Sequence, residues 1–152
     1  MNRLLGQRVY VDANAIIYFA EMHPTFGEPM RAGFQMARQG EATLVTSELP
    51  LAEVLVLPIK ANRQDLVAAY TGLISHRDSF EVISVSRLIL VESANRRASA
   101  GIKLPDAIHV ATAIIANCRI YISEDRNIRT PQRLEHVKIS LLDRDLPTSS
   151  TQ

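Results

Sequence analysis

The sequence predicts an α/β fold, a three-layer α/β/α sandwich with a central parallel sheet. Short β-branched runs alternate with longer stretches in which apolar residues recur at helical spacing. Several of the short runs are apolar at successive positions, as is typical of parallel strands that are covered by helices on both faces. A length of 152 residues and an apolar content of 47% suit one folding unit with one core.

The elements follow in order along the chain. The β-branched runs predict five strands, over residues 8–12, 42–47, 80–85, 119–125 and 136–142. Helical spacing predicts a helix directly after Asp12 and five more, over residues 28–39, 47–60, 63–76, 86–100 and 105–118. Pro24 and Gly27 indicate a turn between the first two helices, while Gly101 and Pro105 are typical of a helix end followed by a helix start.

The chain contains no repeat and no sign of a second domain. We expect a single domain over residues 1–146 and a disordered tail over residues 147–152, which read PTSSTQ. The longest run without Asp, Glu, Lys or Arg, Ala107 to Cys118, is too short for a membrane span. Cys118 is the single cysteine, so no intramolecular disulfide forms, and a buried thiol in the cytoplasm is the expectation.

Charge alone does not predict a nucleic-acid partner. The net charge is only +1, although 14 of the 17 basic residues are arginines and three are lysines. Arginine presents a planar fork that suits two oxygens of a phosphate or a carboxylate. Surface salt bridges or a GC-rich genome explain the same excess, so arginine enrichment supports phosphate binding without establishing it.

Four acidic residues stand at positions where an open α/β sheet binds its ligands, outside the carboxyl ends of the strands. Asp12 closes the first predicted strand and Asp125 the fourth, while Asp106 begins an apolar helix and Glu53 lies within the helix after the second strand. Each acid has an ordinary structural explanation. Asp12 or Asp106 stabilises a helix N-terminus, Asp125 makes a turn, and Glu53 pairs with an arginine while Glu48 caps its helix.

Taken together, the four acids predict a metal site. Two carboxylates about 4 Å apart repel by roughly 4 kcal/mol at an effective dielectric constant near 20. A cation must therefore lie among them, or some of them must be protonated. A ligand set made only of oxygen suits magnesium or manganese rather than zinc. His109, one turn after Asp106, is interpreted as a packed or hydrogen-bonded histidine and is left out of the site.

The segments VDANAIIY, TSELPLAEVL, KLPDAIHVATA and YISEDRNI resemble the four motifs of the PIN-domain nucleases, and most closely those of the VapC-type toxins of bacterial toxin–antitoxin pairs. The resemblance covers residues 9–128. It implies that Asp12, Glu53, Asp106 and Asp125 bind magnesium, or manganese, and cleave RNA by water attack with a 3′-hydroxyl leaving group. Glu53 is preferred to Glu48 as the motif's glutamate because Ser47 lies six residues before it.

Three positions depart from the family pattern. Ala13 stands where a threonine or serine is usual, so one hydroxyl near the metal is missing and Asn14 is the remaining candidate to orient Asp12. Asn127 stands where many relatives have a second aspartate, which leaves open whether one or two metal ions bind. Ser123 replaces a common threonine and keeps the hydroxyl. Arg126 and Arg129 follow the last acid and are candidates to hold flanking phosphates.

The resemblance also implies partners, namely an RNA substrate, a cognate antitoxin and a second copy of the chain in a homodimer. Apolar residues within 29–37 and 66–74 exceed what one core needs, so some of them are candidates to line a homodimer face or a groove for an antitoxin segment, with packing in the core as the alternative. Three alternatives remain: a stand-alone PIN nuclease in RNA maturation, an inactive PIN-like module that binds RNA or protein, and a haloacid-dehalogenase-type phosphotransferase. The last requires a second aspartate two residues after Asp12, where this chain has Asn14.

Overall fold

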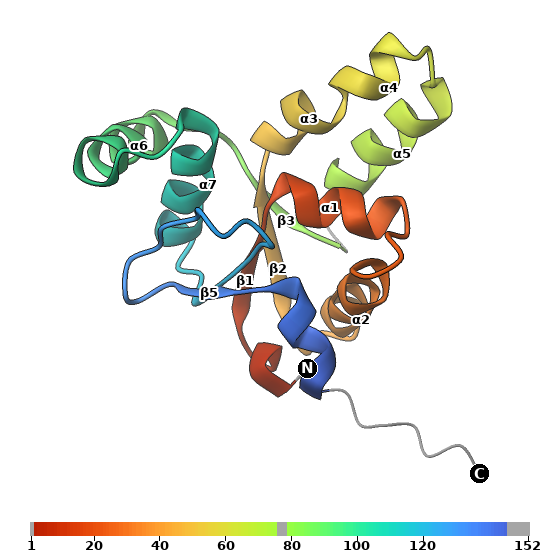
Figure 1. Ribbon diagram of the computed structural model, residues 1–152, viewed down its shortest axis with the longest axis horizontal. Coiled ribbons are helices and arrows are strands. Elements are labelled where there is room, and N and C mark those ends of the chain that lie inside the picture. Colours follow the sequence, from red (N-terminus) through yellow and green to blue (C-terminus); the bar gives the residue numbers. More distant parts are fainter. Residues whose placement is uncertain (1, 76–78, 146–152) are drawn as a thin grey trace.

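The computed structural model describes residues 2–75 and 79–145. The predicted tail over 147–152, residues 1, 76–78 and 146 of the predicted domain, and hence the last residue of the predicted helix over 63–76, lie outside the described residues. Its centre is a parallel sheet whose strands lie in the order β3-β2-β1-β4-β5 (Figure 1). The strands are β1 (Arg8–Val11), β2 (Thr43–Ser47), β3 (Glu81–Ile83), β4 (Ile120–Ile122) and β5 (Glu135–Val137). The predicted α/β sandwich is confirmed.

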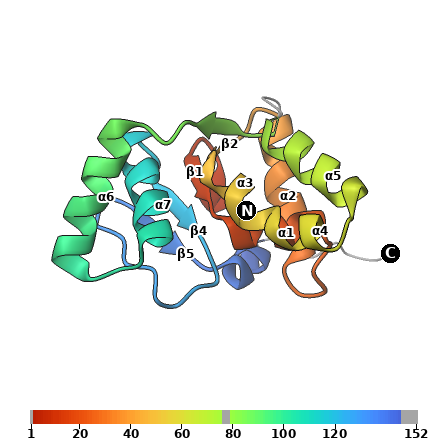
Figure 2. The same ribbon diagram turned by 90° about the horizontal axis from the view of Figure 1, so that it is seen from above.

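Helices cover both faces of the sheet. The connections between β1 and β3 contain α1 (Ala13–Ala20), α2 (Gly27–Arg38), α3 (Leu49–Val54), α4 (Val56–Lys60) and α5 (Gln64–Ser75). The later connection contains α6 (Arg87–Ala100) and α7 (Leu104–Ile115). Seen from above, α6 and α7 lie on one side of the sheet, and α1, α2 and α5 on the other (Figure 2). Two short 3-10 helices, η1 (Asn2–Leu4) and η2 (Ile139–Asp145), complete the described chain.

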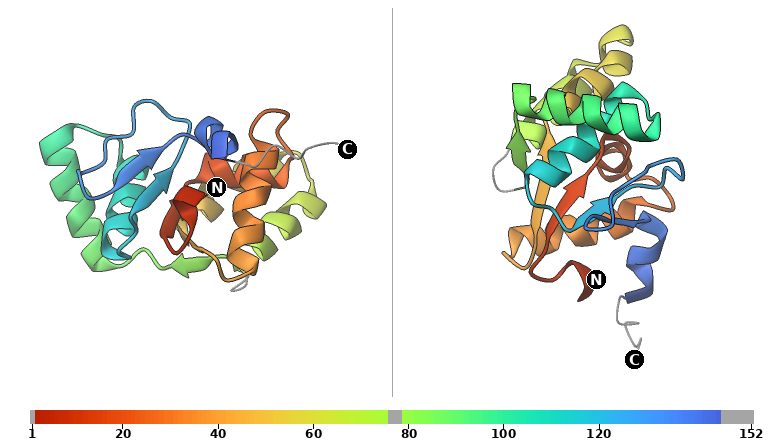
Figure 3. Two further views of the ribbon diagram at one scale, coloured as in Figure 1. Left: turned by 90° about the horizontal axis from the view of Figure 1, so that it is seen from below. Right: turned by 90° about the vertical axis from the view of Figure 1, so that its left-hand side faces the viewer.

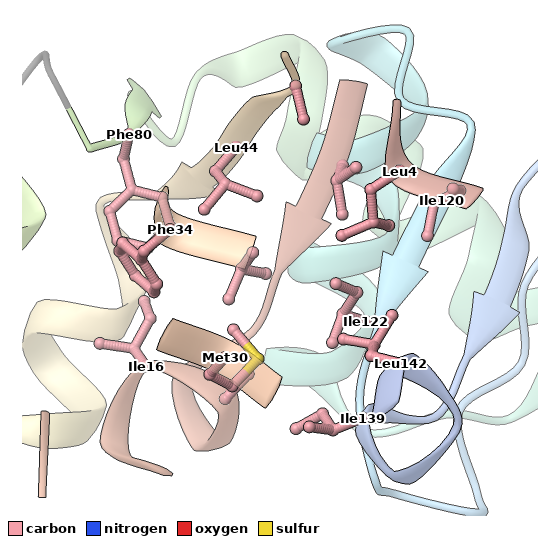
Figure 4. Close-up of a cluster of buried hydrophobic side chains, with 14 of the residues drawn as sticks. Leu4, Ile16, Met30, Phe34, Leu44, Phe80, Ile120, Ile122, Ile139 and Leu142 are labelled. Carbon is pink, nitrogen blue, oxygen red and sulfur yellow. The ribbon is translucent and has the colours of Figure 1, made fainter. Parts of the chain in front are cut away.

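The sheet is buried on both faces, as the sequence predicted. Toward α1 and α2, strand residues such as Leu44, Ile120 and Ile122 pack with Met30 and Phe34, all at most 3% exposed (Figure 4). The opposite face packs Tyr10 and Tyr121 against α7. Figure 3 shows α6 and α7 lying together across that face. Among the described residues, no helix is both long and apolar enough to span a membrane.

Two predicted boundaries were wrong. The predicted helix over 47–60 is broken at Leu55 into α3 and α4. Pro58 has no N–H to donate to the carbonyl of Val54 four residues earlier, and its ring disfavours a continuous helix there. The predicted strand over 136–142 ends at Val137, and η2 follows. A spacing of three residues suits a 3-10 helix and places both Ile139 and Leu142 in the core.

The surplus of apolar residues expected within 29–37 and 66–74 belongs instead to the core. Met30 and Phe34 of α2 and Tyr70 and Ile74 of α5 are at most 2% exposed. Most of the exposed large apolar side chains lie elsewhere, on α4, α6 and the start of α7. They include Val56, Leu57, Ile59, Leu88, Leu90, Val91 and Leu104.

Candidate active site

The strand order brings the predicted acids to one edge of the sheet. β1 pairs with β2 on one side and with β4 on the other, so the order of the strands reverses at β1 although all of them are parallel. Open α/β sheets bind their ligands at such a point. Asp12 directly follows β1, and Asp125 lies three residues after β4. Asp106 occupies the first turn of α7, and Glu53 lies on α3, shortly after β2.

Asp12 is the most deeply buried of the four, with 6% of its surface exposed. Its Oδ1 accepts a hydrogen bond from the backbone N–H of Ala15 at 3.0 Å, so the carboxylate caps α1. Burial raises the pKa of Asp12, and the Ser123 hydroxyl and the Ala15 N–H offset only part of this effect. The fold thus holds a carboxyl group where its ionised form is disfavoured.

Asp106 and Asp125 are half-buried neighbours. Burial raises the pKa of Asp106, and the negative charge of Asp125 raises it further. Asp125 also makes the turn that was one interpretation of it, because its Oδ1 accepts from the N–H of Asn127 at 2.8 Å. The Ser123 hydroxyl accepts from the N–H of Asp125 at 3.1 Å, so the serine orients this turn.

Glu53 has a different partner. Its Oε1 lies 2.6 Å from Nε2 of His109, a side chain that is 3% exposed. The interpretation of His109 as a hydrogen-bonded histidine holds, but its partner is a predicted site residue. Within residues 2–75 and 79–145, no three His, Cys, Asp or Glu side chains converge as a ready set of metal ligands.

Two smaller predictions around the acids were wrong. Glu48 makes no capping bond to α3; the Ser47 hydroxyl accepts instead from the N–H of Leu49 at 3.1 Å. Asn14 is exposed, and it is the Ala15 backbone that fixes Asp12. Arg126 and Arg129, the candidates for phosphate binding, are exposed beside the last acid.

Sequence comparison decides the family, because the family model of the PIN domain matches residues 9–134. The chain belongs to the PIN-domain family. This family consists of nucleases that generally use divalent metal ions. No protein with a curated description matches the sequence.

Solved structures of PIN proteins share the fold. The DNA-bound VapBC of Salmonella typhimurium aligns with a TM-score of 0.69 at 17% identity, over 88% of this chain and 98% of that one. VapBC2 of Rickettsia felis, bound to a promoter fragment, aligns with a TM-score of 0.67 at 16% identity, over 86% and 98%. VapC20 of Mycobacterium tuberculosis, a Sarcin-Ricin loop cleaving toxin, aligns with a TM-score of 0.62 at 12% identity, over 79% and 92%. The fold of this PIN protein is therefore that of the VapC toxins.

The residues at the strand ends fit a divalent metal ion. The hydroxyl of Tyr121, on β4, is buried without a hydrogen-bond partner in the described part of the chain. Burial and the charges of Asp12, Asp106 and Glu53 raise its pKa well above 10, so the hydroxyl lies within reach of these charges. A buried polar atom of this kind calls for a water molecule or an ion nearby. Mg²⁺ keeps several of its waters and needs only one or two protein carboxylates, so the number of carboxylates at this edge is sufficient for it.

Proposed function

We propose that this chain is a magnesium-dependent endoribonuclease and the toxin component of a type II toxin–antitoxin pair. The observation that carries the proposal is the set of three aspartates at one edge of the sheet of a PIN fold. Asp12 and Asp125 follow strands and Asp106 lies in the first turn of α7, and burial raises the pKa of Asp12 and Asp106. Mutual repulsion and desolvation disfavour such a set until a cation neutralises it.

Asp12 and Asp106 are the proposed metal ligands, with Mg²⁺ preferred and Mn²⁺ as a substitute. Asp12 is held in place by its capping bond to Ala15, and Asp106 by its position in the first turn of α7. When bound, the ion lowers the pKa of a water molecule and polarises the scissile phosphate. Asp125 or Glu53 then accepts the proton of the attacking water.

One metal ion is the simpler expectation. Asn127 replaces the aspartate that many relatives carry, and it supplies its backbone N–H to Asp125. The position two residues after Asp125 therefore offers no second carboxylate for another ion. A second ion, if RNA brings one, would rely on Asp125 and on phosphate oxygens.

RNA is the proposed substrate class. Arg126 and Arg129 are exposed just after Asp125, where their guanidinium groups can bind phosphates on either side of the cleaved bond. Lys103 lies near enough to Asp106 for its charge to lower the pKa of that carboxyl. These three cations give the acidic edge a basic border that a polyanion needs.

An antitoxin and a second copy of the chain are the proposed protein partners. The structures with this fold include toxin–antitoxin complexes. On this chain, Leu57 of α4 is 75% exposed and Leu88 of α6 is 64% exposed. Apolar groups this exposed are typical of surfaces that a partner covers. A strictly monomeric protein that co-purifies with no small protein from its native operon would contradict this assignment.

An inactive PIN-like module that binds RNA or protein is the second candidate. It is favoured by Ala13, which lacks the usual hydroxyl, and by the absence of three converging ligands in the described residues. Expression in a bacterial host separates the two candidates. If the chain is a toxin, we expect the wild type to arrest growth and the Asp106→Asn variant not to. Co-expression of the gene upstream should then restore growth. Growth unaffected by the wild-type chain would favour the inactive module or a stand-alone nuclease.

A further inference from the structure

A chain of buried polar groups runs from the centre of the sheet to Glu53. The hydroxyl of Tyr10, on β1, lies 2.6 Å from Nδ1 of His109, on α7. Nε2 of the same ring lies 2.6 Å from Oε1 of Glu53, on α3. Tyr10 is 0% and His109 2% exposed, so the bond between these two side chains is shielded from water. Three elements that are far apart in sequence are thus joined by two short hydrogen bonds.

The direction of these bonds follows from the groups involved. An ionised carboxylate only accepts, so Nε2 carries a proton and donates it to Glu53. With a single proton on the ring, at Nε2, Nδ1 accepts and the Tyr10 hydroxyl donates. Burial keeps that hydroxyl protonated, because it raises the pKa of Tyr10 well above 10. Tyr10 therefore fixes both the tautomer and the orientation of the His109 ring.

His109 constrains a carboxylate that would otherwise be free to move. The Glu53 side chain is 31% exposed and projects from a helix of only six residues. Fixing such a side chain costs conformational entropy. His109 holds Oε1, and no hydrogen bond to Oε2 occurs within the described residues. One oxygen is anchored, and the other remains available.

Packing alone does not require this arrangement. The neighbours of His109 along α7 are apolar and buried, namely Ile108, Val110, Ala111 and Ala113. A leucine opposite a phenylalanine would fill the same space without the cost of burying a hydroxyl and an imidazole. The Glu53 carboxylate as a whole lies close enough to the acids for its charge to raise the pKa of both Asp12 and Asp106.

We propose that His109, oriented by Tyr10, is a positioning residue of the nuclease site, which fixes Glu53 so that its second oxygen serves the metal ion or the attacking water. This role rests on the proposed function. Groups that hydrogen-bond to metal-binding carboxylates typically contribute 10–100-fold to metal affinity or activity. His109 would do so without touching metal or RNA.

The test uses the purified full chain, freed of any antitoxin, and measures Mn²⁺ affinity by titration calorimetry. His109→Leu removes the donor, and we expect Mn²⁺ to bind about 10–100-fold more weakly. His109→Gln keeps an N–H donor near Glu53, and we expect most of the affinity to return. Thr112→Val is the matched control, because it removes a buried polar group one turn from His109 on α7. This variant should bind Mn²⁺ like the wild type.

A second measurement reports the hydrogen bonds directly. Nitrogen NMR of labelled histidine should show His109 protonated at Nε2 and unprotonated at Nδ1. In Tyr10→Phe, which removes one hydroxyl, this single tautomer should be lost and Mn²⁺ affinity should fall. If His109→Leu does not fold, Tyr10→Phe decides the question on its own.

The outcomes separate this role from the proposed function. A wild-type chain that binds no Mn²⁺ overturns the proposed function, and this role with it. If the wild type binds Mn²⁺ and folded His109→Leu or Tyr10→Phe binds it equally well, only the role of His109 is overturned. A failure of His109→Gln to recover affinity, with Thr112→Val normal, also contradicts it.

Discussion

Substituting Asp12 separates its capping role from metal binding. In chelator, Asp12→Ala loses the 3.0 Å bond to the Ala15 N–H, and its free energy of unfolding should be about 1 kcal/mol below that of Asp12→Asn, which keeps an oxygen in the same place. For a domain of this size that lowers the melting temperature by about 2–4 °C. Asp12→Asn keeps an oxygen to cap α1 and removes a buried charge, so its melting temperature should equal or exceed that of the wild type.

Bound metal should reverse the order of the melting temperatures, so that the wild type becomes the most stable of the three proteins. At a metal concentration 100 times its dissociation constant, linkage stabilises the wild type by about 2.7 kcal/mol. This raises its melting temperature by roughly 5–11 °C. Neither variant should gain as much, because both lack the carboxylate.

The assay is a thermal melt of the three proteins in chelator and in Mg²⁺ or Mn²⁺. An Asp12→Asn protein that gains the full metal-dependent shift would show that Asp12 is a helix cap and not a metal ligand. An Asp12→Asn protein that melts below the wild type in chelator would refute the argument that the buried charge is unfavourable, and one that melts together with Asp12→Ala would refute the capping role.

Three further predictions follow from the described side chains. Burial raises the pKa of Asp12 and Asp106 in the folded state, so their contribution to stability is complete below the unfolded value near 3.8 and is lost as the pH rises through the raised values. In chelator, the free energy of unfolding of Asp12→Asn should therefore increase relative to that of the wild type between pH 4 and pH 7. Burial raises the pKa of the Cys118 thiol to about 12, so a thiol reagent should label the native protein far more slowly than the unfolded chain, and equal rates would contradict its burial. Gly27→Ala should lose about 1–3 kcal/mol in denaturant unfolding, because a Cβ there would meet the backbone carbon of Met22 at 2.9 Å; unchanged stability would show that this turn can shift.

The sequence was sufficient for the features that depend on local pattern. Continuous apolar runs predicted parallel buried strands, and the ends of those strands located Asp12 and Asp125. The break at Leu55 was also readable in principle, because Pro58 lacks the N–H that a continuous helix needs. The end of β5 was harder to predict, since the β-branched Ile139 and the apolar Leu142 continue the run of the strand but pack through a 3-10 helix.

The partner of Glu53 could not be predicted from the sequence. Glu53 and His109 are 56 residues apart and meet only because α3 and α7 lie together above the sheet. The spacing of Asp106 and His109 was the one available signal, since it places both on neighbouring turns of a helix. That spacing is equally common for core histidines, and only the fold distinguishes the two cases.

The most direct measurement of the central claim is cleavage of RNA by the purified chain. Total cellular RNA is incubated with the protein in Mg²⁺ or Mn²⁺, and new 5′ ends are mapped by sequencing. We expect discrete cuts that disappear with chelator and in Asp106→Asn. Asp65→Asn is the matched control, because Asp65 on α5 carries a 65% exposed carboxylate that pairs with Arg63, and this variant should cut like the wild type. Cuts that persist in both chelator and Asp106→Asn would contradict a metal-dependent nuclease at this site.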